Sequence, residues 1–123
     1  PEPAVLPDFG LRALVAEDNK FNQVVVRNLA KRIGISVDIA ENGAVVPVGV
    51  SSTLPNVTMV AILIEKNPNA LAATFTLPEG TEANVQTRVK MGQTSNVYAL
   101  VKSDGKFFMA TKEIKVTLGG CGG

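Results

Sequence analysis

Residues 57–65, Val57-Thr58-Met59-Val60-Ala61-Ile62-Leu63-Ile64-Glu65, form an apolar run with little alternation. The chain turns directly after it, at Lys66-Asn67-Pro68-Asn69. A short apolar run bounded by turn residues is typical of a strand that is buried on both faces. The run therefore predicts a strand inside a β-sandwich or at a subunit interface.

The segments on either side of this run also read as β-structure. Val85, Val89 and Met91 alternate with polar residues, as in a half-buried strand, and Ser103-Asp104-Gly105 predicts a hairpin turn. From residue 42 onward, strands are expected at 44–51, 57–65, 71–77, 85–91, 97–102, 106–110 and 111–118. About seven short strands separated by turn residues predict an antiparallel β-sandwich.

The N-terminal part shows a different period. Apolar residues recur at three- and four-residue steps between residues 20 and 33, namely Phe21, Val24, Val25, Leu29 and Ile33. This spacing predicts an amphipathic helix over residues 20–33, which Gly34 would end. A strand is expected to follow at residues 35–40.

Composition excludes several functional classes. The 123 residues suffice for one domain, with 46% hydrophobic and 19% charged residues and a net charge of +1. Because no basic block is present, nucleic acid is not an expected partner. No apolar run approaches the ~20 residues that a membrane-spanning helix needs, so no membrane is expected either.

The sequence contains no histidine and one cysteine. These counts exclude Ser-His-Asp and Cys-His catalysis and the usual zinc sites, so we expect no catalytic residues, no metal and no cofactor. Arg88, Lys90, Lys102 and Lys106 are candidates for a basic face, with an ordinary solvated strand surface as the alternative.

The single cysteine lies in the stretch Gly119-Gly120-Cys121-Gly122-Gly123. Glycine adopts many backbone conformations, so this stretch predicts a thin, flexible arm that spans at most about 17 Å. A free thiol has a pKa of about 8.5, and the nearest basic residue is Lys115. Cys121 is therefore expected to be a poor nucleophile by itself, a thiol that a partner must activate.

The end of the sequence resembles the SoxY family, the sulfur-carrier subunits of the bacterial thiosulfate-oxidising (Sox) system. The similarity covers residues 37–123 and includes "ENGAVVPVGV", "ILIEKNPNALAATFTLPEG" and "KEIKVTLGGCGG". It implies an immunoglobulin-like sandwich in a periplasmic heterodimer with SoxZ. It also implies that Cys121 carries a covalent sulfur or thiosulfate adduct to SoxAX, SoxB and a sulfane dehydrogenase.

A second resemblance covers residues 11–43, which are similar to the opening β-α-β unit of a response-regulator receiver domain. Glu17 and Asp18 match the acidic pair of that family, but the run at 57–65 contains no phosphoacceptor aspartate. The predicted organisation is a helical segment at 1–36, a sandwich at 37–118 and an arm at 119–123.

Several functional alternatives stay open on the sequence. The chain could instead be a receiver-like signalling fragment, or a structural sandwich with an incidental thiol. A third alternative is a ubiquitin-like carrier that is thiocarboxylated at Gly123. A disulfide between two copies of Cys121 is a further possibility. The opening Pro1-Glu2-Pro3 fits a processed secreted protein and a cytosolic one equally well.

Overall fold

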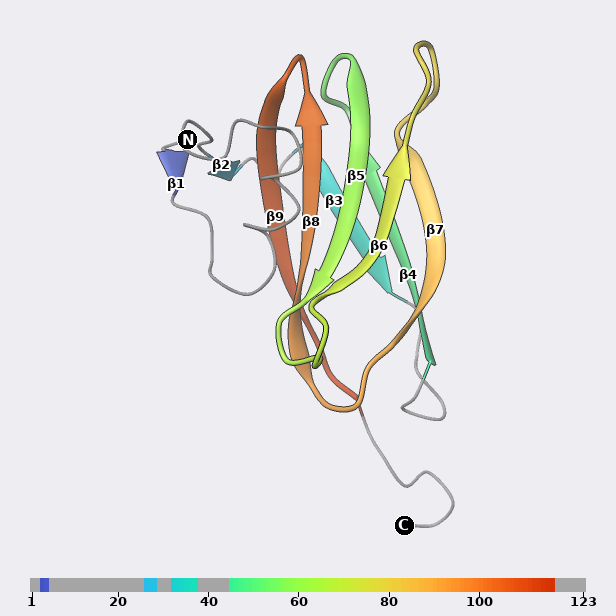
Figure 1. Cartoon of the computed structure of the whole chain (residues 1–123), viewed down its shortest axis with the longest axis vertical. Helices are drawn as coiled ribbons and strands as arrows, with labels where there is room; N and C mark the ends of the chain where they lie inside the picture. The colour runs from blue at the N-terminus through green and yellow to red at the C-terminus, as the bar shows by residue number, and fades with distance from the viewer. Residues whose placement is uncertain (1–2, 5–25, 29–31, 38–44, 117–123) are drawn as a thin grey trace.

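The computed structural model describes residues 3–4, 26–28, 32–37 and 45–116, and these residues form two facing sheets (Figure 1). Their strands are β1 (Pro3–Ala4), β2 (Val26–Asn28), β3 (Ile33–Val37), β4 (Val45–Ser52), β5 (Val57–Ile64), β6 (Leu71–Thr76), β7 (Asn84–Lys90), β8 (Ser95–Ser103) and β9 (Lys106–Ile114). One sheet has the order β1-β2-β9-β8-β5-β6 and the other the order β3-β4-β7. The described part contains no helix, and so none long enough to cross a membrane.

The seven strands β3 to β9 pair with one another only in antiparallel fashion, as the sequence predicts. Alternate side chains of β4, such as Val46, Val48 and Val50, point between the sheets and are almost fully buried. They pack there against Val60 and Ile62 of β5. The mainly β prediction is confirmed, and the arrangement is consistent with an immunoglobulin-like sandwich.

Strand β5 is buried on both faces, which confirms the prediction from its apolar run. Ile62 and Ile64 belong to the core between the sheets, whereas Ala61 and Leu63 belong to a second cluster on the other face of the large sheet. The second cluster also contains Leu100, Phe107 and Met109. Because burying one large apolar side chain stabilises a fold by roughly 1.5–3 kcal/mol, β5 contributes to stability from both of its faces.

The hairpin predicted at residues 103–105 joins β8 to β9. Ser103 pairs with Lys106 across a two-residue turn, in which Asp104 and Gly105 have φ angles of 49° and 77°. Two positive φ angles match the twist of a tight hairpin, and glycine and aspartate tolerate them. Strand β9 then continues without interruption to Ile114, where the sequence had predicted two separate strands. The reason is that β8 is long enough to pair with it as far as Ser95.

The predicted helix at residues 20–33 is wrong wherever the structure describes the chain. Val26–Asn28 form β2, which pairs with β9, and Ile33–Val37 form β3, which pairs with β4. Gly34, expected to end the helix, lies within β3 opposite Ser51. The apolar spacing of three and four residues was a local signal. Backbone pairing and the burial of Ile33, which is 3% exposed, override it.

The pairing of β2 and β3 also differs from what the resemblance of residues 11–43 to a receiver domain implies. The two described strands of that stretch lie in different sheets, and β3 runs antiparallel to its neighbour, unlike strands joined by a crossover helix. β3 also crosses the position between residues 36 and 37 where the sequence placed a boundary. The turn Asn42-Gly43 and the pair Glu17 and Asp18 lie outside the described residues.

Candidate functional site

The site predicted from the sequence lies beyond the last described residue. Cys121 and its four flanking glycines, Gly119, Gly120, Gly122 and Gly123, fall within residues 117–123, outside the described part. The described residues end at Val116, two residues after β9. What it shows is therefore the end of the sandwich from which the predicted arm departs. We call this the β9 end; it includes the turn at residues 65–70 and the loop at 91–94.

The last described residues are held to the sandwich by specific contacts. Ile114 pairs with Ser95 of β8 and is 4% exposed. Two residues later, the Val116 N–H donates a hydrogen bond of 2.9 Å to Thr94 Oγ1. The Thr94 hydroxyl in turn lies 3.5 Å from the Val116 carbonyl oxygen, which accepts from it. Chain position 116 is thus fixed to the 91–94 loop, five residues before Cys121.

The neighbouring turn is tied to the same place. The buried Ser95 hydroxyl accepts a 3.0 Å hydrogen bond from the Lys66 N–H and donates one of 2.9 Å to the Asn96 carbonyl. The Asn67 side-chain amide donates to the Lys90 carbonyl at 2.6 Å. Each bond to a buried acceptor contributes about 0.5–1.5 kcal/mol. Together they join the ends of β5, β7, β8 and β9 into one base.

One titratable group at this end has a shifted pKa. The hydroxyl of Tyr98 on β8 donates a 2.8 Å hydrogen bond to Glu65 Oε1 at the end of β5. Burial raises the pKa of Tyr98 to about 12, and the hydrogen bond and negative charge of Glu65 act in the same direction. A neutral hydroxyl at this position donates and does not serve as a base at neutral pH.

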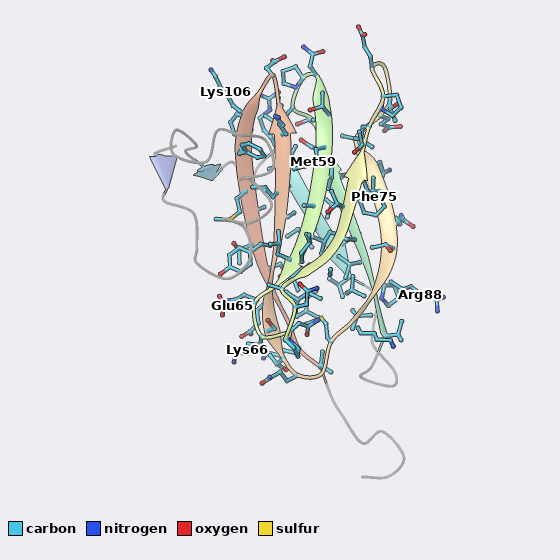
Figure 2. All side chains as sticks on the ribbon, in the orientation of Figure 1. Met59, Glu65, Lys66, Phe75, Arg88 and Lys106 are labelled. Carbon is cyan, nitrogen blue, oxygen red and sulfur yellow. The ribbon has the colours of Figure 1, made fainter. Side chains whose placement is uncertain are left out.

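Cationic side chains gather around the β9 end. We define the cationic rim as five exposed residues, Lys66, Arg88, Lys90, Lys112 and Lys115. Figure 2 shows Lys66 and Arg88 toward the end where β9 finishes, with Lys106 near the opposite end. The four residues that the sequence suggested as one basic face therefore lie at two different ends of the sandwich. Arg88 and Lys90 belong to the rim, whereas Lys102 and Lys106 flank the hairpin turn at the far end.

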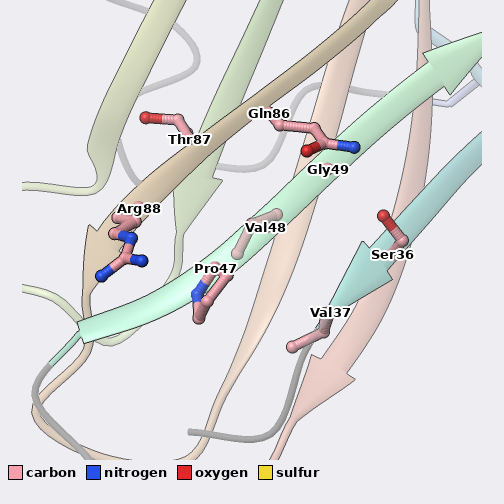
Figure 3. Close-up of a pocket in the computed structure, with 8 residues that line it drawn as sticks. All are labelled: Ser36, Val37, Pro47, Val48, Gly49, Gln86, Thr87 and Arg88. Atoms are coloured by element: carbon pink, nitrogen blue, oxygen red, sulfur yellow. The ribbon is translucent and has the colours of Figure 1, made fainter.

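The outer face of the small sheet carries a pocket of about 480 Å³ next to this rim (Figure 3). Ser36, Gly49 and Gln86 lie side by side across β3, β4 and β7, with Pro47 and Arg88 beside them. A Cβ on Gly49 would meet the Ser36 hydroxyl, which would have to rotate away to admit it. The pocket is polar and open, and Arg88 is the charged residue that lines it.

A second pocket, of about 750 Å³, lies at the opposite end of the sandwich and is lined by Glu79, Glu82 and Asp104 among others. Within the described ranges, no three His, Cys, Asp or Glu residues are close enough to hold a metal ion. The second pocket is also lined by hydroxyl-bearing residues, among them Ser52, Thr53 and Thr58.

Sequence reasoning missed the contacts that fix the last described residues to the sandwich. Thr94 and Ser95 follow Gly92-Gln93 and look like ordinary loop residues. Their partners Val116 and Lys66 are 22 and 29 positions away. A weak signal was available, since serine and threonine near a strand end often bond to the backbone, but the partner cannot be read from local sequence.

Comparisons with known proteins agree with this geometry. The chain matches the family described as "Sulfur oxidation protein SoxY" over residues 21–121, a span that includes the cysteine. The sulfur carrier protein SoxY from Chlorobium limicola f. thiosulfatophilum superposes with a TM-score of 0.73. It is 31% identical, and the match covers 86% of this chain and 90% of that chain.

More distant structures share the fold alone. A superoxide reductase (neelaredoxin) from Ignicoccus hospitalis is 18% identical with a TM-score of 0.58, over 75% of this chain and 95% of that chain. The hypothetical protein PH1083 from Pyrococcus horikoshii OT3 is 14% identical with a TM-score of 0.55, over 75% of this chain and 96% of that chain. No curated protein sequence matches this one significantly. The family match over most of the chain and the identity to the Chlorobium protein show that the chain belongs to the SoxY family of sulfur oxidation proteins.

Proposed function

We propose that this protein is a non-catalytic carrier that holds sulfur intermediates covalently on Cys121 and presents them to partner enzymes. The observation that carries the proposal is the match to a sulfur carrier protein that is 31% identical over 86% of the chain. The family match extends to residue 121, the position of the single cysteine. Glycines on both sides of Cys121 would let the thiol enter a narrow cleft.

The chemistry of such a cycle begins with an oxidation. The Cys121 thiol and thiosulfate lose two electrons and one proton, and a new S–S bond leaves a thiosulfonate on the cysteine. A haem enzyme of the SoxAX type would accept the electrons. A SoxB-type hydrolase would then add one water and release sulfate and two protons, leaving a persulfide anion. A sulfane dehydrogenase would oxidise the remaining sulfur further.

In this proposal the chain supplies the thiol and the platform, while its partners supply the catalysis. The described residues fit that division of labour, because the contacts at the β9 end hold position 116 to the sandwich. We further propose that the protein works in the periplasm as a heterodimer with a SoxZ subunit. Strand β6 forms the edge of the large sheet and is one candidate surface for that contact.

The test is the intact mass of the protein after incubation with thiosulfate and its oxidising partner, read with and without reductant. We expect reductant-sensitive additions of thiosulfate and then of sulfur, mapped to Cys121 by peptide analysis. The variant Cys121→Ser should carry no addition and should unfold at the same denaturant concentration as the parent chain. Unfolding on this substitution, or an adduct on Gly123 in place of Cys121, would contradict the carrier mechanism.

A further inference from the structure

The charge of the described residues is distributed unevenly between the two ends of the sandwich. The β9 end holds the five cations of the cationic rim and two carboxylates, Glu65 and Glu113. Glu65 already accepts the hydrogen bond from Tyr98. Four rim residues lie at or directly after the ends of two strands, β7 and β9, and Lys66 lies in a turn, so the fold, and not a basic run in the sequence, brings them together.

The opposite end shows no such excess. Its cations are Arg32, Lys102 and Lys106, with Arg27 on β2 opposite Phe108, and its carboxylates are Glu79, Glu82 and Asp104. Four cations thus stand against three carboxylates, and all three carboxylates line a pocket there. Most of the positive excess of the described residues therefore lies at the end from which the chain continues toward Cys121.

Covalent geometry keeps Cys121 near this rim. Cys121 is five positions after Val116, and a fully extended chain covers at most about 17 Å over five steps. Val116 is itself bonded to Thr94 at the β9 end. Because the screening length at 0.1 M salt is about 10 Å, much of the space that the thiol reaches lies within the field of the rim.

We propose that the cationic rim attracts anionic sulfur compounds to Cys121 and stabilises the sulfonate end of its adduct. The inference about the adduct rests on the proposed carrier function; the attraction of anionic reagents does not. A thiosulfonate on cysteine keeps one negative charge, and thiosulfate and tetrathionate carry two. Lysine and arginine side chains are the groups that bind such oxoanions in proteins.

Two disulfide reagents of different charge test the attraction. Dithiobis(nitrobenzoate) is a dianion and dithiodipyridine is neutral. In both reactions the Cys121 thiolate attacks one sulfur, a new S–S bond forms and an aromatic thiolate leaves. The ratio of the two rates cancels any change in the fraction of thiolate or in access to it. Tetrathionate, a third reagent, reacts in the same way, leaves the thiosulfonate on Cys121 and releases thiosulfate.

The variant Lys66→Gln/Lys90→Gln removes two exposed cations of the rim. At low salt we expect the ratio of anionic to neutral rates to fall about threefold, and the reaction with tetrathionate to slow by a similar factor. Added salt should lower the ratio in the parent chain and have less effect in the variant. Glu113→Gln should change the ratio in the opposite direction. Lys106→Gln removes one cation at the opposite end and is the control; its ratio should equal that of the parent, whereas Lys66→Gln or Lys90→Gln alone should lower it.

Two results would overturn the proposal. One is a ratio that is unchanged in the rim variant, whether the two aromatic reagents keep their rates or slow equally. The other is an equal effect of Lys106→Gln, which would indicate net charge alone. These results concern only the rates with small reagents. The carrier function fails separately, if partner enzymes place no adduct on Cys121, so the two ideas can be judged independently.

Discussion

At the scale of single residues, Thr94 holds Val116, the last described residue, to the sandwich. Its hydroxyl oxygen accepts the Val116 N–H. Thr94→Val keeps the shape and removes the acceptor, so we expect the free energy of unfolding to fall by about 1 kcal/mol. Chemical denaturation measures this loss, and hydrogen exchange at the Val116 amide should accelerate. Thr94→Ser retains the hydroxyl and is the control. If Thr94→Val left both quantities unchanged, the contact would have no role in anchoring the arm.

Tyr98 makes the stability of the fold depend on pH in the alkaline range. Its pKa rises from 10.0 to about 12 through burial first and through Glu65 second. A raised pKa means that folding favours the protonated hydroxyl, so this stabilisation is complete below pH 10 and is lost as pH rises toward 12.

The titration of Tyr98 can be measured directly. The sequence has one tyrosine and no tryptophan, so tyrosinate absorbance reports this group alone. Glu65→Gln should lower the midpoint only part of the way toward 10, because the effect of burial remains. A midpoint near 10 in the unchanged chain would show that Tyr98 is not held as described.

At the scale of elements, β5 differs from an ordinary sandwich strand because both of its faces are covered. Ile62 and Leu63 are each 0% exposed, although they point to opposite sides of the large sheet. We expect Ile62→Ala and Leu63→Ala to lower the free energy of unfolding by similar amounts, about 2–5 kcal/mol each. Thr58→Ala, at an exposed position of β5, should cost less than about 1 kcal/mol. Denaturant titration of the three variants is the measurement, and a near-zero cost for Leu63→Ala would contradict burial on both faces.

At the scale of the whole molecule, a single cysteine next to four glycines makes covalent pairing of two chains possible. Any disulfide formed by this sequence must join Cys121 to another molecule. We expect mild oxidation to give a disulfide-linked dimer that reductant converts back to monomers. The variant Cys121→Ser should stay monomeric under the same conditions. Non-reducing electrophoresis and the mass of the intact species measure the outcome. Oxidised protein that stays monomeric at high concentration, with a free thiol, would argue against an accessible Cys121.

Much of the fold was predictable because its signals are local. The apolar run at 57–65 predicted β5, the alternation from Val85 predicted β7, and Ser103-Asp104-Gly105 predicted the hairpin turn. The helix prediction failed at Val26–Asn28 and at Ile33, since helical spacing says nothing about which strands lie nearby to pair. The strand expected at residues 35–40 is confirmed for residues 35–37, the part of it that the structure describes. The Thr94–Val116 contact could not be predicted either, because it joins residues that are 22 positions apart in the sequence.

The sequence by itself determined the mainly β character of the chain, the lack of histidine chemistry and the identity of Cys121 as the single thiol. These properties depend on composition and on short-range periodicity. Only the tertiary structure decided that β5 is covered on both faces, that Thr94 and Ser95 form the base for the last residues, and that the rim cations share one end. Each of these depends on the pairing of strands that are distant in sequence. Such pairing is selected by the total burial and hydrogen bonding of the fold, and not by any one segment.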